Sequence, residues 1–247
     1  MKQSAFMSYA GKVDAYVAGR PEYPPALLSE LPDVDFAIDL GAGTGISTEM
    51  LTLKAKRVLA VEPVAEMARK IPVDRLPAIQ VAIASAEAIP APDGSAGLVM
   101  SATAFHWFDY DAAAAEIVRV LAPGGSLALL WNIRDGSVPW VARFDAVMDA
   151  CAGDTPRQST GKWRRIFSDP RFEHVASKSY QYTQPMPSSG IVARAMSTSF
   201  VAALDATGQE RVRGEIEAIV ASEPSLAGGG PVAFPYVTEL HLFLARA

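Results

Sequence analysis

The chain has 247 residues; half of them are hydrophobic, a fifth are charged, and the net charge is −5 at neutral pH. This length suits a single α/β domain, and the lack of a basic excess argues against a nucleic-acid partner. The single cysteine, Cys151, excludes an internal disulfide, and no cluster of Cys and His has zinc-ligand spacing. Residues 1–20 lack the apolar core of a secretory signal, and no run of about 18 apolar residues predicts a membrane span. We therefore expect a cytoplasmic protein without a metal or membrane partner.

Short apolar runs bounded by turn signals alternate with helical patterns through the first half of the chain. Strands are predicted at 36–40, 57–62, 79–83, 97–102 and 126–131. A helix fits each gap, most clearly over 111–121, where Asp111 is the expected N-cap and residues 123–125 are the expected stop. This alternation predicts a parallel sheet that is buried on both faces.

The pattern changes after Trp131. Apolar residues from Trp140 to Cys151 fall at helical spacing, and a polar loop is expected from there to Lys162. Further helices are predicted at 188–204 and 209–221, and further strands at 175–183 and 232–244. We expect the two late strands to complete the sheet.

A glycine-rich turn follows the first predicted strand and precedes a predicted helix, in the segment Asp39-Leu40-Gly41-Ala42-Gly43-Thr44-Gly45. Glycines permit positive φ and a close approach of a ligand, and the helix behind them presents unpaired N–H groups. The dinucleotide fingerprint requires a third glycine where Ile46 stands. Asp39 at the strand end also suits a positively charged ligand better than a pyrophosphate. The turn therefore favours S-adenosylmethionine over a nicotinamide dinucleotide.

Two later segments complete an adenosine site. Glu62 ends the second predicted strand 21 residues after Gly41, the spacing at which doubly wound folds place an acid on a ribose diol. Ser85 follows the third strand, where its hydroxyl can bond the exocyclic amine of adenine. The alternatives are an exposed surface glutamate and an ordinary polar loop in which Glu87 caps a helix or is solvated.

His106 lies just beyond the carboxyl end of the fourth predicted strand, where open parallel sheets bind ligands. For a hydroxyl or protonated nitrogen acceptor it is a candidate general base; for a carboxylate acceptor it would only orient the substrate. The alternative role of His106 is a structural hydrogen bond beneath the cofactor. Trp107 beside it is expected to exclude water or to hold a cation by its π face.

Five segments, in order and spacing, resemble the class I S-adenosylmethionine-dependent methyltransferases, in particular the small-molecule branch that includes the trans-aconitate methyltransferase type. They are residues 39–45, 61–63, 84–90, 105–108 and 119–125. Residues 16–24 are similar to the N-terminal segment of that branch, in which Tyr16 and Arg20 would close over the cofactor. The chain departs from the family pattern at Ala84, where glycine is usual, and at Gly97, where aspartate is usual.

The resemblance implies a Rossmann-like α/β fold with seven mostly parallel strands, helices on both faces and a helical substrate-capping insertion. Residues 1–247 would form one domain: a cofactor-binding core over about 30–135, cap elements at about 1–29 and 136–230, and a final strand at 232–247. The implied activity is in-line methyl transfer from S-adenosylmethionine to an oxygen, nitrogen or carboxylate of a small organic molecule, with S-adenosylhomocysteine as product.

The expected site residues fall into a cofactor set and an acceptor set. The cofactor set is Tyr16, Arg20, Asp39, Gly41, Ala42, Gly43, Thr44, Gly45, Glu62, Pro63, Ser85, Ala86, Glu87, Ser101, Thr103 and Trp107. The acceptor set is Trp131, Arg134, Trp140, Ser197 and Tyr236. Three other functions stay open: an RNA methyltransferase, a cofactor-binding protein without transferase activity, and a nicotinamide-dependent oxidoreductase. A homodimer is the default assembly.

Overall fold

The computed structural model describes residues 21–226 and 230–246. Its strands are β1 (Val34–Leu40), β2 (Ala55–Val61), β3 (Ile79–Ala82), β4 (Ala96–Ala102), β5 (Leu121–Arg134), β6 (Phe172–Met186) and β7 (Val232–Ala245). Its helices are α3 (Ile46–Leu51), α4 (Ala65–Ala68), α5 (Tyr110–Val120), α6 (Pro139–Ala152), α7 (Ser188–Met196), α8 (Ser199–Ala202) and α9 (Ala206–Ser222). Short 3-10 helices are η1 (Pro25–Glu30), η2 (Phe105–Trp107), η3 (Gln158–Thr160) and η4 (Lys162–Ser168).

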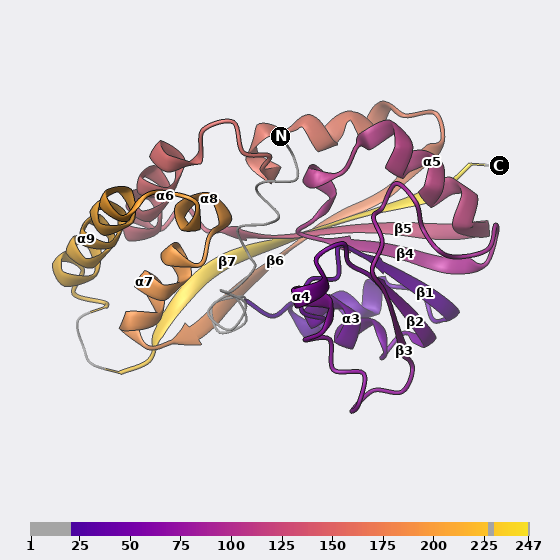
Figure 1. Ribbon diagram of the computed structural model, residues 1–247, viewed down its shortest axis with the longest axis horizontal. Coiled ribbons are helices and arrows are strands. Elements are labelled where there is room, and N and C mark those ends of the chain that lie inside the picture. Colours follow the sequence, from indigo (N-terminus) through magenta and orange to yellow (C-terminus); the bar gives the residue numbers. More distant parts are fainter. Residues whose placement is uncertain (1–20, 227–229, 247) are drawn as a thin grey trace. The chain divides into compact units, whose positions relative to one another are not determined.

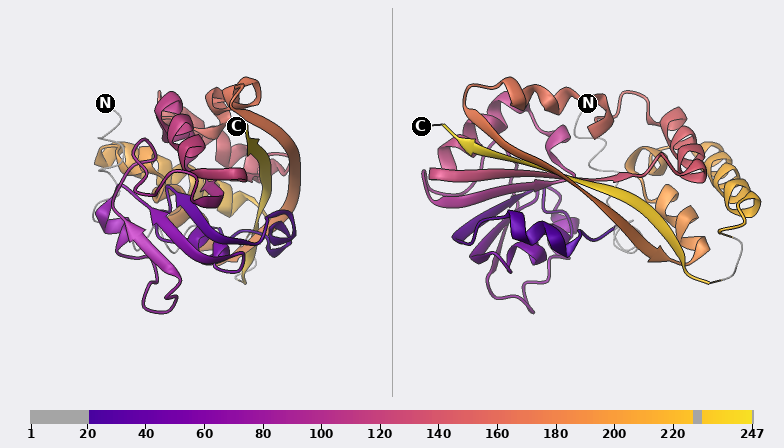
Figure 2. Two further views of the ribbon diagram at one scale, coloured as in Figure 1. Left: turned by 90° about the vertical axis from the view of Figure 1, so that its right-hand side faces the viewer. Right: turned by 180° about the vertical axis from the view of Figure 1, so that it is seen from behind.

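The strands described form one seven-stranded sheet in the order β3-β2-β1-β4-β5-β7-β6. The pairs β3–β2, β2–β1, β1–β4 and β4–β5 are parallel, and Ile38 of β1 lies beside Leu59 of β2 and Val99 of β4. The arrowheads of β6 and β7 point in opposite directions (Figure 2). This arrangement confirms the predicted Rossmann-like, mostly parallel sheet. The parallel strands place their carboxyl ends at one edge, which is where the predicted cofactor residues begin.

The chain divides into two compact units. The first, the core unit, comprises 23–132, 156–180 and the described residues from 238 onward. The second, the helical unit, comprises 133–155 and 181–237 without 227–229, together with residues 21 and 22. Strands β5, β6 and β7 contribute residues to both units, so the division does not follow a simple cut along the chain.

The core unit is built on strands that are buried on both faces. Ala37, Leu98 and Met100 lie on one face in a cluster with Leu51 of α3, while the alternate residue Ile38 is equally buried on the other face. Figure 1 shows α3 and α5 on opposite sides of this part of the sheet. Each fully buried Leu or Ile side chain contributes about 1.5–3 kcal/mol to folding, so these faces hold the sheet together.

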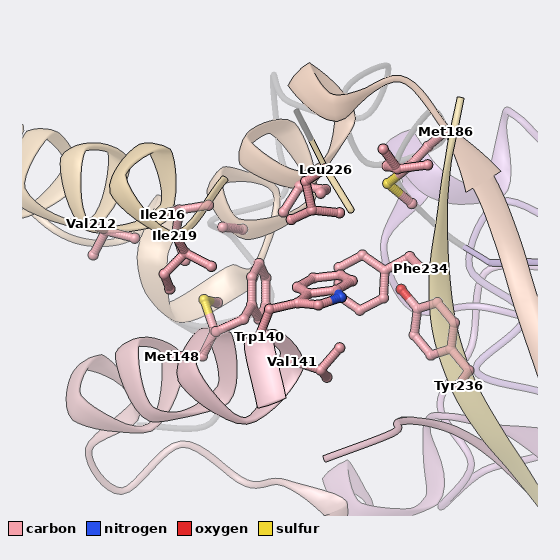
Figure 3. Packing of buried hydrophobic residues seen from close by; sticks show 14 of the residues in the cluster. Trp140, Val141, Met148, Met186, Val212, Ile216, Ile219, Leu226, Phe234 and Tyr236 are labelled. Atoms are coloured by element: carbon pink, nitrogen blue, oxygen red, sulfur yellow. The ribbon is translucent and has the colours of Figure 1, made fainter. Parts of the chain in front are cut away.

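The helical unit has its own apolar cluster, which Figure 3 shows. The ring of Phe234 on β7 lies 4.9 Å from the ring centre of Trp140 and 5.4 Å from that of Phe144, both on α6, in edge-to-face geometry. Ile191 of α7 and Ile216 of α9 belong to the same cluster and are fully buried. The helical spacing from Trp140 to Cys151 therefore produced the predicted helix, here Pro139–Ala152.

Several element boundaries differ from the sequence prediction. The side chain of Asp109, and not Asp111, caps α5 by accepting from the N–H of Ala112. Strand β5 begins at Leu121, so the predicted helix stop at residues 123–125 lies within that strand. Leu121 pairs with Ala96 of β4 and pairing resumes at Ser126 opposite Leu98, so residues 122–125 form an irregularity within the strand.

Two predictions in the second half were wrong in detail. The helix predicted at 188–204 divides into α7 and α8, because the hydroxyls of Ser197 and Thr198 donate to the carbonyl of Arg194 where α7 ends. The segment predicted as a loop up to Lys162 contains η3, and η4 follows it with Trp163 only 2% exposed. Of the helices in the described ranges, none has the length and hydrophobicity of a membrane span.

Candidate active site

The glycine turn has the backbone geometry that its sequence predicts. Gly41, Gly43 and Gly45 all have positive φ, at +71°, +59° and +97°. A Cβ on Gly41 would lie 2.4 Å from the Cβ of Ala104, the residue that precedes η2. Gly41 is therefore required both for its conformation and for the close packing of the loop that carries His106.

Asp39 lies near the end of β1 in a fully buried position. Its Oδ2 accepts from the hydroxyls of Ser47 at 2.8 Å and Thr48 at 2.7 Å, both on α3. Its Oδ1 has no hydrogen-bond partner within 21–226 and 230–246. Burial raises the pKa of Asp39 from 3.8 to about 6, against the lowering effect of the two hydroxyls. A buried carboxylate oxygen without a partner is a place where a ligand cation is favourable.

We expect the Asp39→Asn variant to remove a pH-dependent loss of stability. Because burial raises the pKa of Asp39, the protonated form favours folding: this contribution is complete below pH 3.8 and is lost as the pH rises through about 6. Relative to Asp39→Asn, the wild type should lose up to about 3 kcal/mol of unfolding free energy over this range. Urea unfolding at a series of pH values measures the difference. Asp74→Asn, at an exposed aspartate, is the control, and parallel profiles for wild type and Asp39→Asn would contradict the expectation.

Glu62 directly follows β2 and is 4% exposed. Its Oε2 accepts from the backbone N–H of Gly43 at 2.8 Å, and its Oε1 accepts from that of Val64 at 2.9 Å. Burial raises the pKa of Glu62, the two backbone bonds oppose this, and nearby Asp39 adds to it. Each oxygen keeps a second lone pair, so the oriented carboxylate can still accept from two hydroxyls.

The end of β4 carries a strained residue. Thr103 has φ +57°, which is unusual for a β-branched side chain. Its hydroxyl lies 3.1 Å from the hydroxyl of Tyr23, and its N–H donates to the carbonyl of Leu130 at 2.7 Å. Ser101, two residues earlier, is fully buried, and its hydroxyl has no partner among the residues that the structure describes. Strained backbone and unsatisfied polar groups are typical of functional sites.

His106 lies in η2, which begins three residues after β4 ends. The indole N–H of Trp131 on β5 donates to Nδ1 of His106 at 3.2 Å. Trp131 is 1% exposed and packs against the ring of Trp163, with ring centres 4.1 Å apart. The structure therefore brings together His106, the predicted catalytic residue, and Trp131 of the acceptor set.

The predicted adenine loop after β3 is joined to the start of α5. Glu87 accepts from the N–H of Asp109 at 2.7 Å, so this carboxylate has a structural partner. Ser85 is half-buried, and its carbonyl accepts from Ala88 at 3.1 Å. Gly97 lies at the start of the next strand, where a Cβ would lie 2.8 Å from Cγ1 of Val34.

The remaining members of the cofactor set differ in exposure. The buried ones are Ala42, Thr44 and Ala86, the half-buried one is Trp107, and the exposed one is Pro63. Tyr16 and Arg20 lie outside the described residues.

Four members of the acceptor set lie in the helical unit. Trp140 and Tyr236 are 5% and 1% exposed inside the apolar cluster, where Tyr236 stacks on Phe234 (Figure 3). Arg134 forms an ion pair with Asp145, and burial raises the pKa of Asp145 although Arg134 opposes it. Ser197 lines a pocket of about 730 Å³ between α7 and α9. Arg134, Trp140 and Tyr236 are not among the lining residues of this pocket.

A methyltransferase domain model matches residues 38–129, the stretch from β1 to β5 that holds this site. An uncharacterized methyltransferase from Mycobacterium bovis is 32% identical over 234 residues, which cover 94% of this chain and 93% of that protein. The chain belongs to the class I methyltransferase family.

Solved structures agree with this methyltransferase assignment. A putative type II methyltransferase from Anaeromyxobacter dehalogenans superimposes with a TM-score of 0.63 and 25% identity, covering 92% of this chain and 97% of that chain. A geranyl diphosphate methyltransferase, solved in complex with SAM, has the same fold, with a TM-score of 0.51, 14% identity, and 90% and 82% of the two chains covered.

Sequence reasoning missed several residues that shape the site of this methyltransferase. Ser47 and Thr48 hold Asp39, and only their place in the first turn after the glycine motif could have indicated this. Tyr23 belongs to the N-terminal segment 16–24 but received no role, yet its hydroxyl meets that of Thr103. Trp163 follows the predicted loop and was given no role, although its ring covers Trp131.

Proposed function

We propose that this methyltransferase transfers a methyl group from S-adenosylmethionine to a small organic molecule. The observation that carries the proposal is the pair of buried carboxylates beside the glycine turn. Two backbone N–H groups orient the carboxylate of Glu62, and each of its oxygens keeps a lone pair for a further hydrogen bond. Asp39 has one carboxylate oxygen without a hydrogen-bond partner in the described chain. A ribose diol and a positively charged amino acid group match these two carboxylates.

The residues present fit S-adenosylmethionine better than a nicotinamide dinucleotide. Glu62 would suit the ribose of either ligand, but the buried carboxylate of Asp39 beside the turn disfavours a pyrophosphate and favours a ligand with a sulfonium and an ammonium. When bound, S-adenosylmethionine supplies a methyl group that its positive sulfur already activates. Glu62 would hold the ribose, Asp39 would favour the positive end, and Ser85 would lie on the adenine side.

The protein's own contribution is mainly positional. Holding an acceptor atom near the activated methyl group in a site without water supplies several kcal/mol of the barrier. The aromatic residues Phe105, Trp107 and Phe108 around His106 suit such exclusion of water, since Phe105 and Phe108 already pack edge to face at 5.6 Å. No covalent intermediate with the protein is needed.

A small organic acceptor agrees with the charge of the chain, and the helical unit by itself holds a pocket of suitable size. The net charge of −5 disfavours a polyanionic RNA. The pocket between α7 and α9, about 730 Å³ in volume, has the size of small-molecule sites. Its lining combines apolar side chains such as Val192 and Met196 with the polar Ser197 and Gln209.

Calorimetric titration with S-adenosylhomocysteine tests the cofactor before any acceptor is known. We expect micromolar affinity for S-adenosylhomocysteine and none for NADH in the same preparation. Transfer of labelled methyl groups from S-adenosylmethionine to a panel of small acids, alcohols and amines then tests the acceptor class. Folded protein that binds NADH and not S-adenosylhomocysteine would overturn the proposal, and methylation of RNA alone would overturn its acceptor class.

A further inference from the structure

The hydrogen bond between Trp131 and His106 defines where the imidazole proton lies. An indole nitrogen carries a hydrogen and has no lone pair to offer, so it is only a donor. Its partner at 3.2 Å, Nδ1 of His106, must therefore present a lone pair. A neutral imidazole has one N–H and one lone-pair nitrogen, so the proton of His106 is on Nε2.

We propose that Trp131 is a positioning residue that fixes His106 in the Nε2–H tautomer, so that His106 does not act as the general base in the proposed methyl transfer. This inference rests on the proposed methyl transfer, because it assigns a role within that reaction. It excludes the general base and keeps the two other roles that the sequence left open for His106, which are orienting the substrate and a structural hydrogen bond beneath the cofactor.

The surroundings of Trp131 make the alternative tautomer costly. With the proton on Nδ1, two N–H groups would face each other, and the N–H of the 1% exposed Trp131 would lose the acceptor that it has in His106. The indole cannot turn away freely, because its ring lies against Trp163 at 4.1 Å and near His241 at 6.1 Å between ring centres. Trp163 is itself fixed by donating to the carbonyl of Gln158 at 3.0 Å.

The same contact excludes the usual route for a histidine base. A base must offer a lone pair to the acceptor, and the lone pair of His106 is already directed at Trp131. A protonated Nε2 is a donor and cannot take up a further proton. An acceptor atom that must lose a proton therefore loses it to a group other than His106.

Nitrogen NMR of the histidine rings tests this inference directly, with neither cofactor nor acceptor present. The chain has only three histidines, and the signals that vanish in His106→Gln identify those of His106. In protein with labelled histidine near neutral pH, we expect Nδ1 of His106 to have the shift of a lone-pair nitrogen and Nε2 that of an N–H nitrogen. A proton on Nδ1 in the wild-type protein would overturn the proposal without any variant.

The variant Trp131→Phe removes the donor while keeping an aromatic ring. We expect the ratio of the Nε2–H to the Nδ1–H tautomer to fall by about tenfold, the value of one ordinary hydrogen bond. Trp163→Phe is the matched control, because it changes the packing around Trp131 without touching the hydrogen bond, and it should leave the ratio unchanged. An equal change in both variants, or no change in a folded Trp131→Phe, would show that packing and not the indole N–H sets the tautomer.

These outcomes are separable from those of the proposed function. If S-adenosylhomocysteine binds but Nδ1 carries the proton, the positioning role is wrong and methyl transfer stands. If the tautomer is as expected but no S-adenosylhomocysteine binds, Trp131 still fixes the tautomer of His106. The proposed role of this contact in methyl transfer is then overturned.

Discussion

Replacing Glu62 with glutamine should lower the affinity for S-adenosylhomocysteine by at least about 100-fold, because two charge-assisted hydrogen bonds to the ribose are worth about 1.5–3 kcal/mol each. The effect is enlarged by the turn itself. A glutamine can accept from only one of the two N–H groups, those of Gly43 and Val64, and its amide NH₂ would face the other. Calorimetric titration of variant and wild type measures the loss.

Glu66→Gln is the matched control for this experiment. Glu66 is an exposed glutamate four residues further along, in the first turn of α4. We expect it to bind as the wild type does. Thermal unfolding of both variants shows whether they are folded, and wild-type affinity in folded Glu62→Gln would remove the ribose assignment.

Replacing Gly41 with alanine should destabilise the protein by about 2–5 kcal/mol, which is the sum of a left-handed backbone cost and a packing clash. The φ of +71° disfavours any Cβ, and the added atom would lie 2.4 Å from the Cβ of Ala104. For a chain of this size, the melting temperature should fall by roughly 5–15 °C. Thermal and urea unfolding provide the measurement.

Gly94→Ala separates the two causes. Gly94 has a similar φ of +61°, but a Cβ there would meet nothing within 4 Å. The Gly94→Ala variant should therefore lose only the free energy of the left-handed backbone, about 1–2 kcal/mol. Adding Ala104→Gly to the Gly41→Ala variant should restore the part of the unfolding free energy that the clash removes. Equal losses of unfolding free energy in Gly41→Ala and Gly94→Ala would show that the close approach of Ala104 does not matter.

The sequence predicts those parts of the site that depend on short stretches of chain. A strand, a glycine turn and a helix follow one another within a few residues, so the position of Asp39 and the turn at Gly41 could be predicted from residue order. Glu62 was equally predictable, because the stretch from the glycine turn to the end of the next strand in a βαβ unit has a nearly fixed length. The start of β5 was less predictable, since the pairing of Leu121 with Ala96 of β4 places residues 122–125, which usually form turns, inside the strand as an irregularity.

The contacts of the predicted residues could not be inferred in the same way. The bond from Trp131 to His106 joins positions 25 residues apart, and that between Tyr23 and Thr103 joins positions 80 apart. No local periodicity encodes such pairs, because they depend on how the loops after neighbouring strands approach each other. His106 was found by its place after a strand, whereas its tautomer follows from a partner that only the fold brings within reach.

The sequence by itself determined the class of fold, the glycine turn with its two acids and the family, because each rests on the order and spacing of residues close together in the chain. Only the tertiary structure decided that β7 lies between β5 and β6, that Asp39 keeps one oxygen without a partner in the described chain, and that Trp131 directs a proton at His106. The physical reason is that hydrogen bonding and burial depend on neighbours in space. Residues far apart in the chain become such neighbours only once the sheet has formed.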